Sequence, residues 1–81
     1  MEWLFVPHID IYSFPREIDK LKLTLDILNC INNNFQVGDN DVSISLIKIL
    51  EKDWSRVIID EKIIKNSKFL IKEPGYDFKK G

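Results

Sequence analysis

The 81-residue chain contains a single cysteine, Cys30, and a single histidine, His8. One cysteine cannot form an internal disulfide, and a small domain without disulfides is typical of a reducing compartment, so we predict a cytoplasmic protein. A zinc site usually takes about four Cys or His ligands, or three and a water, and these two residues cannot supply them. We therefore predict a domain that folds without a metal or another cofactor.

Long apolar runs are also missing. No run approaches the roughly 18 residues of a membrane span, so we predict no membrane partner. The first seven residues lack the basic start of a secretory signal peptide. With only three glycines, the chain has no Gly-rich phosphate loop, and it shows no nucleophile elbow and no paired-carboxylate motif. These absences predict a protein that is not an enzyme.

Alanine is absent, whereas isoleucine, lysine and asparagine are abundant. This bias follows AT-rich codons, as in AT-rich bacteria, their phages or other mobile elements. The hydrophobic fraction of 44% and a net charge of −1 exclude a disordered chain. We find no repeat and no linker, so residues 1–81 are predicted to form a single small domain.

The most regular element is a helix predicted from about Arg16 to Asn34, with Ser13 as its cap and Pro15 in its first turn. This helix is apolar on more than one side. We predict that a first stripe packs on a sheet. This stripe comprises Ile18, Leu21, Leu25, Leu28 and Phe35. A second stripe comprises Leu23, Ile27, Cys30 and Ile31 and needs cover from another element, from a second copy of the chain or from a partner.

The other elements are shorter. The side chains of residues 9–12 alternate in polarity, which predicts a strand. The first residues of the segment 42–53 are compatible with a strand, but we favour a helix over the whole segment. Residues 57–59 are an uninterrupted run of β-branched side chains. Such a run is typical of a buried strand or of a turn of buried helix, and the strand explains it better. Pro74-Gly75 predicts a type II turn at the tip of a C-terminal hairpin.

These elements predict a small α+β domain, with one long helix packed on a small, mainly antiparallel sheet that includes the C-terminal hairpin.

Three local patterns could carry chemistry. His8 and Asp10 could pair as a base and its orienting carboxylate, although two residues at this spacing share one face of any strand. Cys30 lies late in its helix, where the helix dipole disfavours a thiolate, so inert packing is the better interpretation. Residues 38–41 lack the spacing of a calcium loop and are explained by a turn.

We therefore hypothesise a small non-enzymatic protein-binding module: an inhibitor, an immunity-type protein, an adaptor or a regulatory subunit. Its contact would be the stripe of Leu23, Ile27 and Ile31, and self-association through this stripe is as compatible with the sequence as a foreign partner. The alternative is a winged-helix-like DNA-binding regulator, whose wing would be the terminal hairpin. Nucleic acid is the less favoured partner, because the predicted recognition helix around residues 57–64 leaves little polar face for bases.

Overall fold

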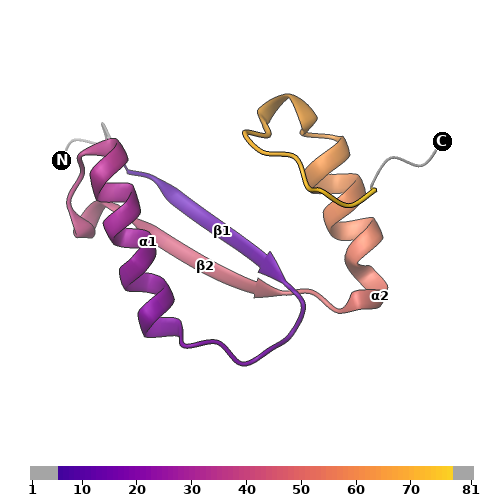
Figure 1. The fold of residues 1–81 in the computed structure, drawn as a ribbon, viewed down its shortest axis with the longest axis horizontal. Coiled ribbons are helices and arrows are strands. Elements are labelled where there is room, and N and C mark those ends of the chain that lie inside the picture. Colours follow the sequence, from indigo (N-terminus) through magenta and orange to yellow (C-terminus); the bar gives the residue numbers. More distant parts are fainter. Residues whose placement is uncertain (1–5, 78–81) are drawn as a thin grey trace.

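The computed structural model describes residues 6–77. The elements follow one another along the chain as two strands separated by a helix, and then a second helical region (Figure 1). In order they are β1 (His8–Ser13), α1 (Lys20–Phe35), a 3₁₀ turn (Asp39–Asp41), β2 (Ser43–Lys48), α2 (Glu51–Trp54), the π-helical segment η2 (Ser55–Ile64) and a second 3₁₀ turn (Ser67–Phe69).

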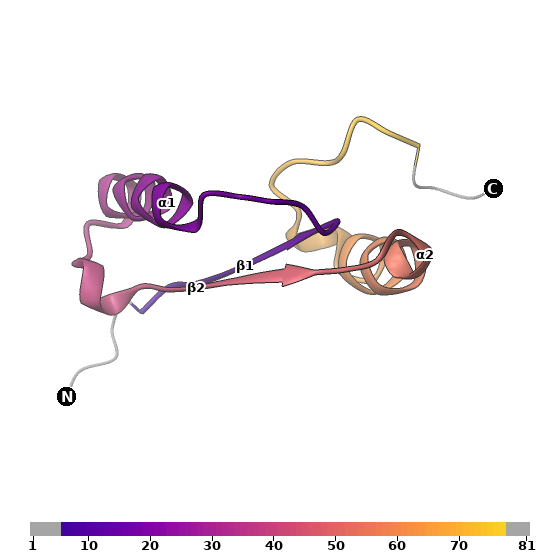
Figure 2. The same ribbon diagram turned by 90° about the horizontal axis from the view of Figure 1, so that it is seen from below.

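The two strands pair in parallel, from His8 opposite Ser43 to Ser13 opposite Lys48. Parallel neighbours cannot be joined by a tight turn and need a crossover connection, which is usually a helix. Here α1 is that connection, and it lies over one face of the strands (Figure 2). The small α+β fold agrees with the prediction, but the mainly antiparallel sheet was wrong.

Local signals explain the bounds of α1. Asp19 caps its start by accepting a hydrogen bond from the backbone N–H of Lys22 at 3.0 Å, so the helix begins later than the predicted Arg16. Its end is marked by Gln36, which has the left-handed conformation with φ of 57° and donates its N–H to Asn32. Both ends therefore satisfy backbone groups that have no partner within the helix.

The face of α1 that packs is not the predicted one. Leu23, Ile27 and Ile31 are half-buried, whereas Leu21 is 71% exposed and Leu25 is 55% exposed. Because both stripes of this helix are apolar, periodicity could not tell which of them the crossover turns toward the sheet. The first stripe was therefore wrongly predicted to be the core.

Residues 42–53 do not form the helix that we favoured. The alternation at their start becomes β2, and the following helix begins only at Glu51. Conversely, the predicted strand at 57–59 lies inside η2, which continues α2 into one helical region. A short β-branched run fits a buried helix as well as a buried strand, and this run forms the helix.

This second helical region carries the core. Ile58, Ile59 and Ile63 are the only described hydrophobic residues that are buried, at 5%, 8% and 8% exposure. Side chains from β1, from the residue after β2, from the helical region itself and from the C-terminal segment pack against them, namely Tyr12, Ile49, Trp54, Val57 and Leu70. The core therefore lies at the carboxyl end of the sheet, where β1 and β2 meet η2.

The predicted C-terminal hairpin is not formed. After Ser67–Phe69 the chain has no strand as far as Asp77, and no described glycine has a positive φ, so Gly75 does not occupy the third position of a type II turn. The last residues of that hairpin, 78–81, lie outside the described part. Without the hairpin in residues 6–77, the winged-helix alternative loses its wing. None of the helices in this range is long and apolar enough to cross a membrane.

Candidate functional site

A pocket of about 510 Å³ opens beside the carboxyl end of β1. Its lining residues come from three separate parts of the chain: the end of β1 with the loop that follows it, the helix α2, and the C-terminal segment. They are Tyr12, Ser13, Phe14, Arg16, Trp54 and Tyr76. The position is physically sensible, because ligands of open sheets with parallel strands bind beyond the carboxyl ends of the strands.

Aromatic rings make up most of the pocket wall. The rings of Phe14 and Trp54 meet edge to face, with centroids 4.8 Å apart and an interplanar angle of 73°. The ring of Tyr12 is held from another side by the ammonium group of Lys62, 5.2 Å from its centroid. Such contacts fix ring orientations, so the pocket presents flat apolar surfaces to a small organic molecule.

Among residues 6–77, Arg16 is the only charged side chain in this lining. It lies in the loop between β1 and α1, after Pro15, and is exposed. A guanidinium group offers several N–H donors in a planar fork that matches a carboxylate. The phenols of Tyr12 and Tyr76 and the hydroxyl of Ser13 add groups that both donate and accept hydrogen bonds. The pocket therefore suits an anionic molecule with an apolar or aromatic body.

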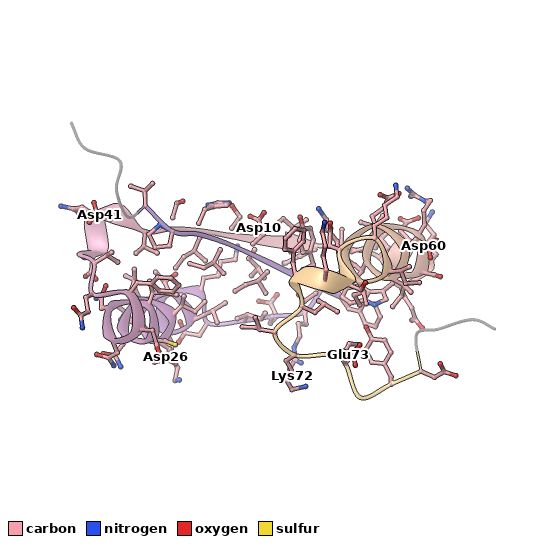
Figure 3. The ribbon with its side chains drawn as sticks, turned by 90° about the horizontal axis from the view of Figure 1, so that it is seen from above. Asp10, Asp26, Asp41, Asp60, Lys72 and Glu73 are labelled. Atoms are coloured by element: carbon pink, nitrogen blue, oxygen red, sulfur yellow. The ribbon has the colours of Figure 1, made fainter. Side chains whose placement is uncertain are left out.

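A second polar cluster lies at the start of β1. His8 Nε2 is 2.7 Å from Asp10 Oδ1, and His8 Nδ1 is 2.6 Å from Ser43 Oγ. Parallel pairing places Ser43 directly opposite His8, and pleating places Asp10 on the same face of β1 as His8. Figure 3 shows Asp10 on the side of the sheet away from α1.

The residues that the sequence singled out are not brought together into one site. Leu23, Ile27 and Ile31 lie half-buried along α1 and do not line the pocket. His8 and Asp10 do form the pair that their spacing allowed, and Ser43 is an addition that only the strand register reveals. Cys30 is exposed, so the expectation of inert packing in the interior was wrong.

Sequence reasoning missed the pocket itself. One usable signal was the position of Arg16, four residues after the predicted strand at 9–12 and at the start of the predicted helix, because side chains on the connections between elements are well placed for binding. The contributions of Trp54 and Tyr76 could not be inferred, since they depend on how distant segments fold back. Among the described residues, no three His, Cys, Asp or Glu side chains are grouped so that they could hold a metal ion.

Comparison with known proteins supplies the remaining information. No known family profile matches the chain. The chain is 36% identical over 74 residues to the tautomerase PptA of Enterobacter sp. (strain 638), and 42% and 40% identical to the tautomerases PptA of Escherichia coli O127:H6 and O139:H28. Each match covers 88% of this chain and 97% of the relative.

These relatives overturn the functional hypothesis. Proteins that match this chain over nearly their whole length are named tautomerases, so the prediction of a non-enzymatic inhibitor or regulatory module was wrong, and so was its DNA-binding alternative. The absence of familiar catalytic motifs misled the interpretation, because those motifs represent only some of the ways in which side chains transfer protons.

Proposed function

Because the chain belongs to the PptA tautomerase family, we propose that it is a tautomerase that binds its substrate in the pocket beside the carboxyl end of β1. A tautomerase moves a proton between a carbon and an oxygen of a carbonyl compound. The observation that carries the choice of site is the guanidinium group of Arg16 in the lining of a mainly aromatic pocket.

The size and lining of the pocket support this proposal. A volume of about 510 Å³ lies within the roughly 300–1,000 Å³ of small-molecule sites. Arg16 binds the carboxylate of an enolisable acid, and the rings of Phe14 and Trp54 pack against its apolar part. Negative charge develops on oxygen when a carbonyl compound loses its carbon-bound proton, and a nearby cation stabilises that charge. The substrate class is therefore an aromatic or branched 2-oxo acid.

Enolisation requires a group that donates a proton to the carbonyl oxygen, and the proton that leaves carbon passes to solvent water, from which the donor is restored. Tyrosine can act as a general acid or base, and Tyr12 and Tyr76 both line the pocket. We assign the donor role to Tyr12, because packing against the buried isoleucine cluster and the contact with Lys62 hold its ring in place. A positioned donor needs little rearrangement as the reaction proceeds.

The test uses phenylpyruvate, which combines an aromatic ring, an enolisable carbonyl group and a carboxylate. We expect Arg16→Ala to raise KM at least tenfold and Arg16→Lys to recover part of the loss. Arg56→Ala is the matched control, because Arg56 is the other arginine of the chain and lies 3.5 Å from Asp53, outside the pocket lining. Equal effects of the two arginine variants, or no enolisation of phenylpyruvate by the wild-type protein, would contradict the proposal.

A second measurement separates binding from proton transfer. Tyr12→Phe keeps the ring and its packing but removes the hydroxyl group. We expect kcat to fall at least tenfold with little change in KM, because the hydroxyl acts on the developing charge and not on the bound carboxylate. An unchanged kcat would remove Tyr12 from the mechanism and leave the binding role of Arg16 intact.

We also propose that the protein self-associates. Only three described hydrophobic residues are buried, while Leu21, Leu25 and Phe35 on α1 are 71%, 55% and 55% exposed. Within residues 6–77, each strand of the two-stranded sheet has an open edge, and open edges invite pairing. A second copy that adds to this sheet would also cover these exposed residues of α1. It would cover the part of the Leu23, Ile27 and Ile31 stripe that the sheet leaves open as well.

Light scattering on purified protein tests this assembly. Leu25→Lys should shift the protein toward a smaller species, because a charge in an apolar contact is expensive. Leu50→Lys provides the control, since Leu50 is similarly exposed at 52% but lies outside α1. A wild-type protein that is monomeric at high concentration would refute self-association and would leave the proposed pocket untouched. The predicted cytoplasmic location stays a prediction.

A further inference from the structure

The polar cluster at the start of β1 is a chain of three hydrogen-bonded side chains. Ser43 Oγ lies 2.6 Å from His8 Nδ1, and His8 Nε2 lies 2.7 Å from Asp10 Oδ1. These residues belong to two different strands, and Ser43 and His8 are 35 positions apart in the sequence. The paired strands hold all three, so the arrangement does not depend on a mobile loop.

The protonation pattern of the chain follows from hydrogen-bond chemistry. An ionised carboxylate only accepts hydrogen bonds, so Asp10 requires the proton of a neutral His8 to be on Nε2. Nδ1 then carries a lone pair and accepts a hydrogen bond from the hydroxyl group of Ser43. The order is hydroxyl nucleophile, imidazole base and orienting carboxylate, which is the arrangement that activates serine in unrelated folds.

The cluster is open to small molecules. The side chains of His8 and Asp10 are 50% and 42% exposed, and Ser43 is also exposed. Ser45 follows Ser43 on the same face of β2, roughly 6–7 Å along the strand. Ser45 therefore presents a second hydroxyl group on the face of the sheet that carries this cluster.

We propose that Ser43, His8 and Asp10 form a second reactive centre, which accepts acyl groups from small activated esters. This centre is separate from the pocket, because His8 begins β1 and the pocket residues Tyr12 and Ser13 end it. None of the three residues lines the pocket. The activity is an acyl transfer and not a tautomerisation, so it goes beyond the function proposed above.

The reaction needs only the ester and water. Ser43 Oγ attacks the carbonyl carbon of the ester while its proton passes to His8 Nδ1. The bond between the carbonyl carbon and the alcohol oxygen then breaks, and His8 returns the proton to the departing alcohol. Water attacks the resulting acyl-Ser43 ester with His8 as base, which releases the carboxylic acid and restores the hydroxyl group of Ser43. Asp10 stays ionised and keeps the imidazole ring oriented throughout.

The test follows p-nitrophenyl acetate with the full chain. We expect release of p-nitrophenol and an acetyl group on Ser43, located by peptide mass spectrometry. Ser43→Ala should abolish acetylation at this position and lower the rate of p-nitrophenol release at least tenfold. Ser67→Ala is the matched control, because Ser67 is an exposed serine in a 3₁₀ turn, whereas the hydrogen bonds of His8 within residues 6–77 go to Ser43 and Asp10. Its removal should leave the rate unchanged.

Asp10→Asn separates a catalytic role from a merely structural one. The amide has nearly the shape of the carboxylate, but its NH₂ group can donate to Nε2 and move the ring proton to Nδ1, where it blocks acceptance from Ser43. We expect at least a tenfold slower acetylation of Ser43 with an unchanged circular dichroism spectrum. Two results would overturn the proposal. One is that Ser43 and Ser67 become acetylated at the same rate in the wild-type protein. The other is that a folded Asp10→Asn variant acetylates Ser43 as fast as the wild-type protein.

Discussion

Replacement of Ile58 by alanine tests whether the second helical region holds the fold together. Ile58 is 5% exposed and belongs to the buried hydrophobic cluster of residues 6–77. The substitution removes three carbon atoms, which at roughly 0.8 kcal/mol each accounts for about 2.4 kcal/mol of transfer free energy. The cavity that remains adds to this loss, so we expect the free energy of unfolding to fall by about 3–4 kcal/mol.

Ile71→Ala is the matched control, because Ile71 is fully exposed, at 103%. It should change the free energy of unfolding by less than about 0.5 kcal/mol. Urea denaturation followed by circular dichroism measures both variants. The protein concentration must be held constant, since self-association stabilises the folded state by mass action. A difference of less than about 1 kcal/mol between the two variants would refute the placement of the core at Ile58.

Three further predictions concern α1. Asp19→Ala should lower the free energy of unfolding by about 1 kcal/mol, measured by thermal denaturation, because the N–H of Lys22 loses its cap. Gln36→Gly should raise it by up to about 1 kcal/mol in urea, because φ of 57° favours glycine. The hydrogen bond and the charge of Asp26 raise the pKa of Lys22, so the pair stabilises the helix at neutral pH and this contribution is lost as pH rises through the raised pKa. NMR titration of Asp26→Asn should show the pKa of Lys22 back near its ordinary value, and an unchanged pKa would contradict the assignment.

Local signals predicted the long helix but not its bounds or its packed face. The run after Arg16 has no glycine or proline until Gly38, which made a helix a safe prediction. Its start was misplaced because Ser13 and Asp19 are both good capping residues, and only the chain geometry selects Asp19. Its packed face was misjudged because two apolar stripes compete, and the choice depends on contacts with strands elsewhere in the sequence.

The remaining errors have the same origin. The segment that contains Ile58 and Ile59 is β-branched and buried, which periodicity alone cannot assign to helix or strand. The pair of His8 and Asp10 was visible as a local spacing, but the hydroxyl group of Ser43 joins it only through the parallel register. The pocket depends on Trp54 and Tyr76 reaching the end of β1, and no spacing in the sequence encodes such long-range contacts.

The parallel pairing of β1 and β2 also sets an order of events during folding. Caps at both ends of α1 use only neighbouring residues, so this helix can form in about a microsecond or less. The sheet joins residues 35 positions apart, and such pairing must first meet the entropic cost of closing a long loop. The hydrogen-bonded chain of Ser43, His8 and Asp10 therefore assembles late, and its reactivity toward an ester would mark the chains that have completed folding.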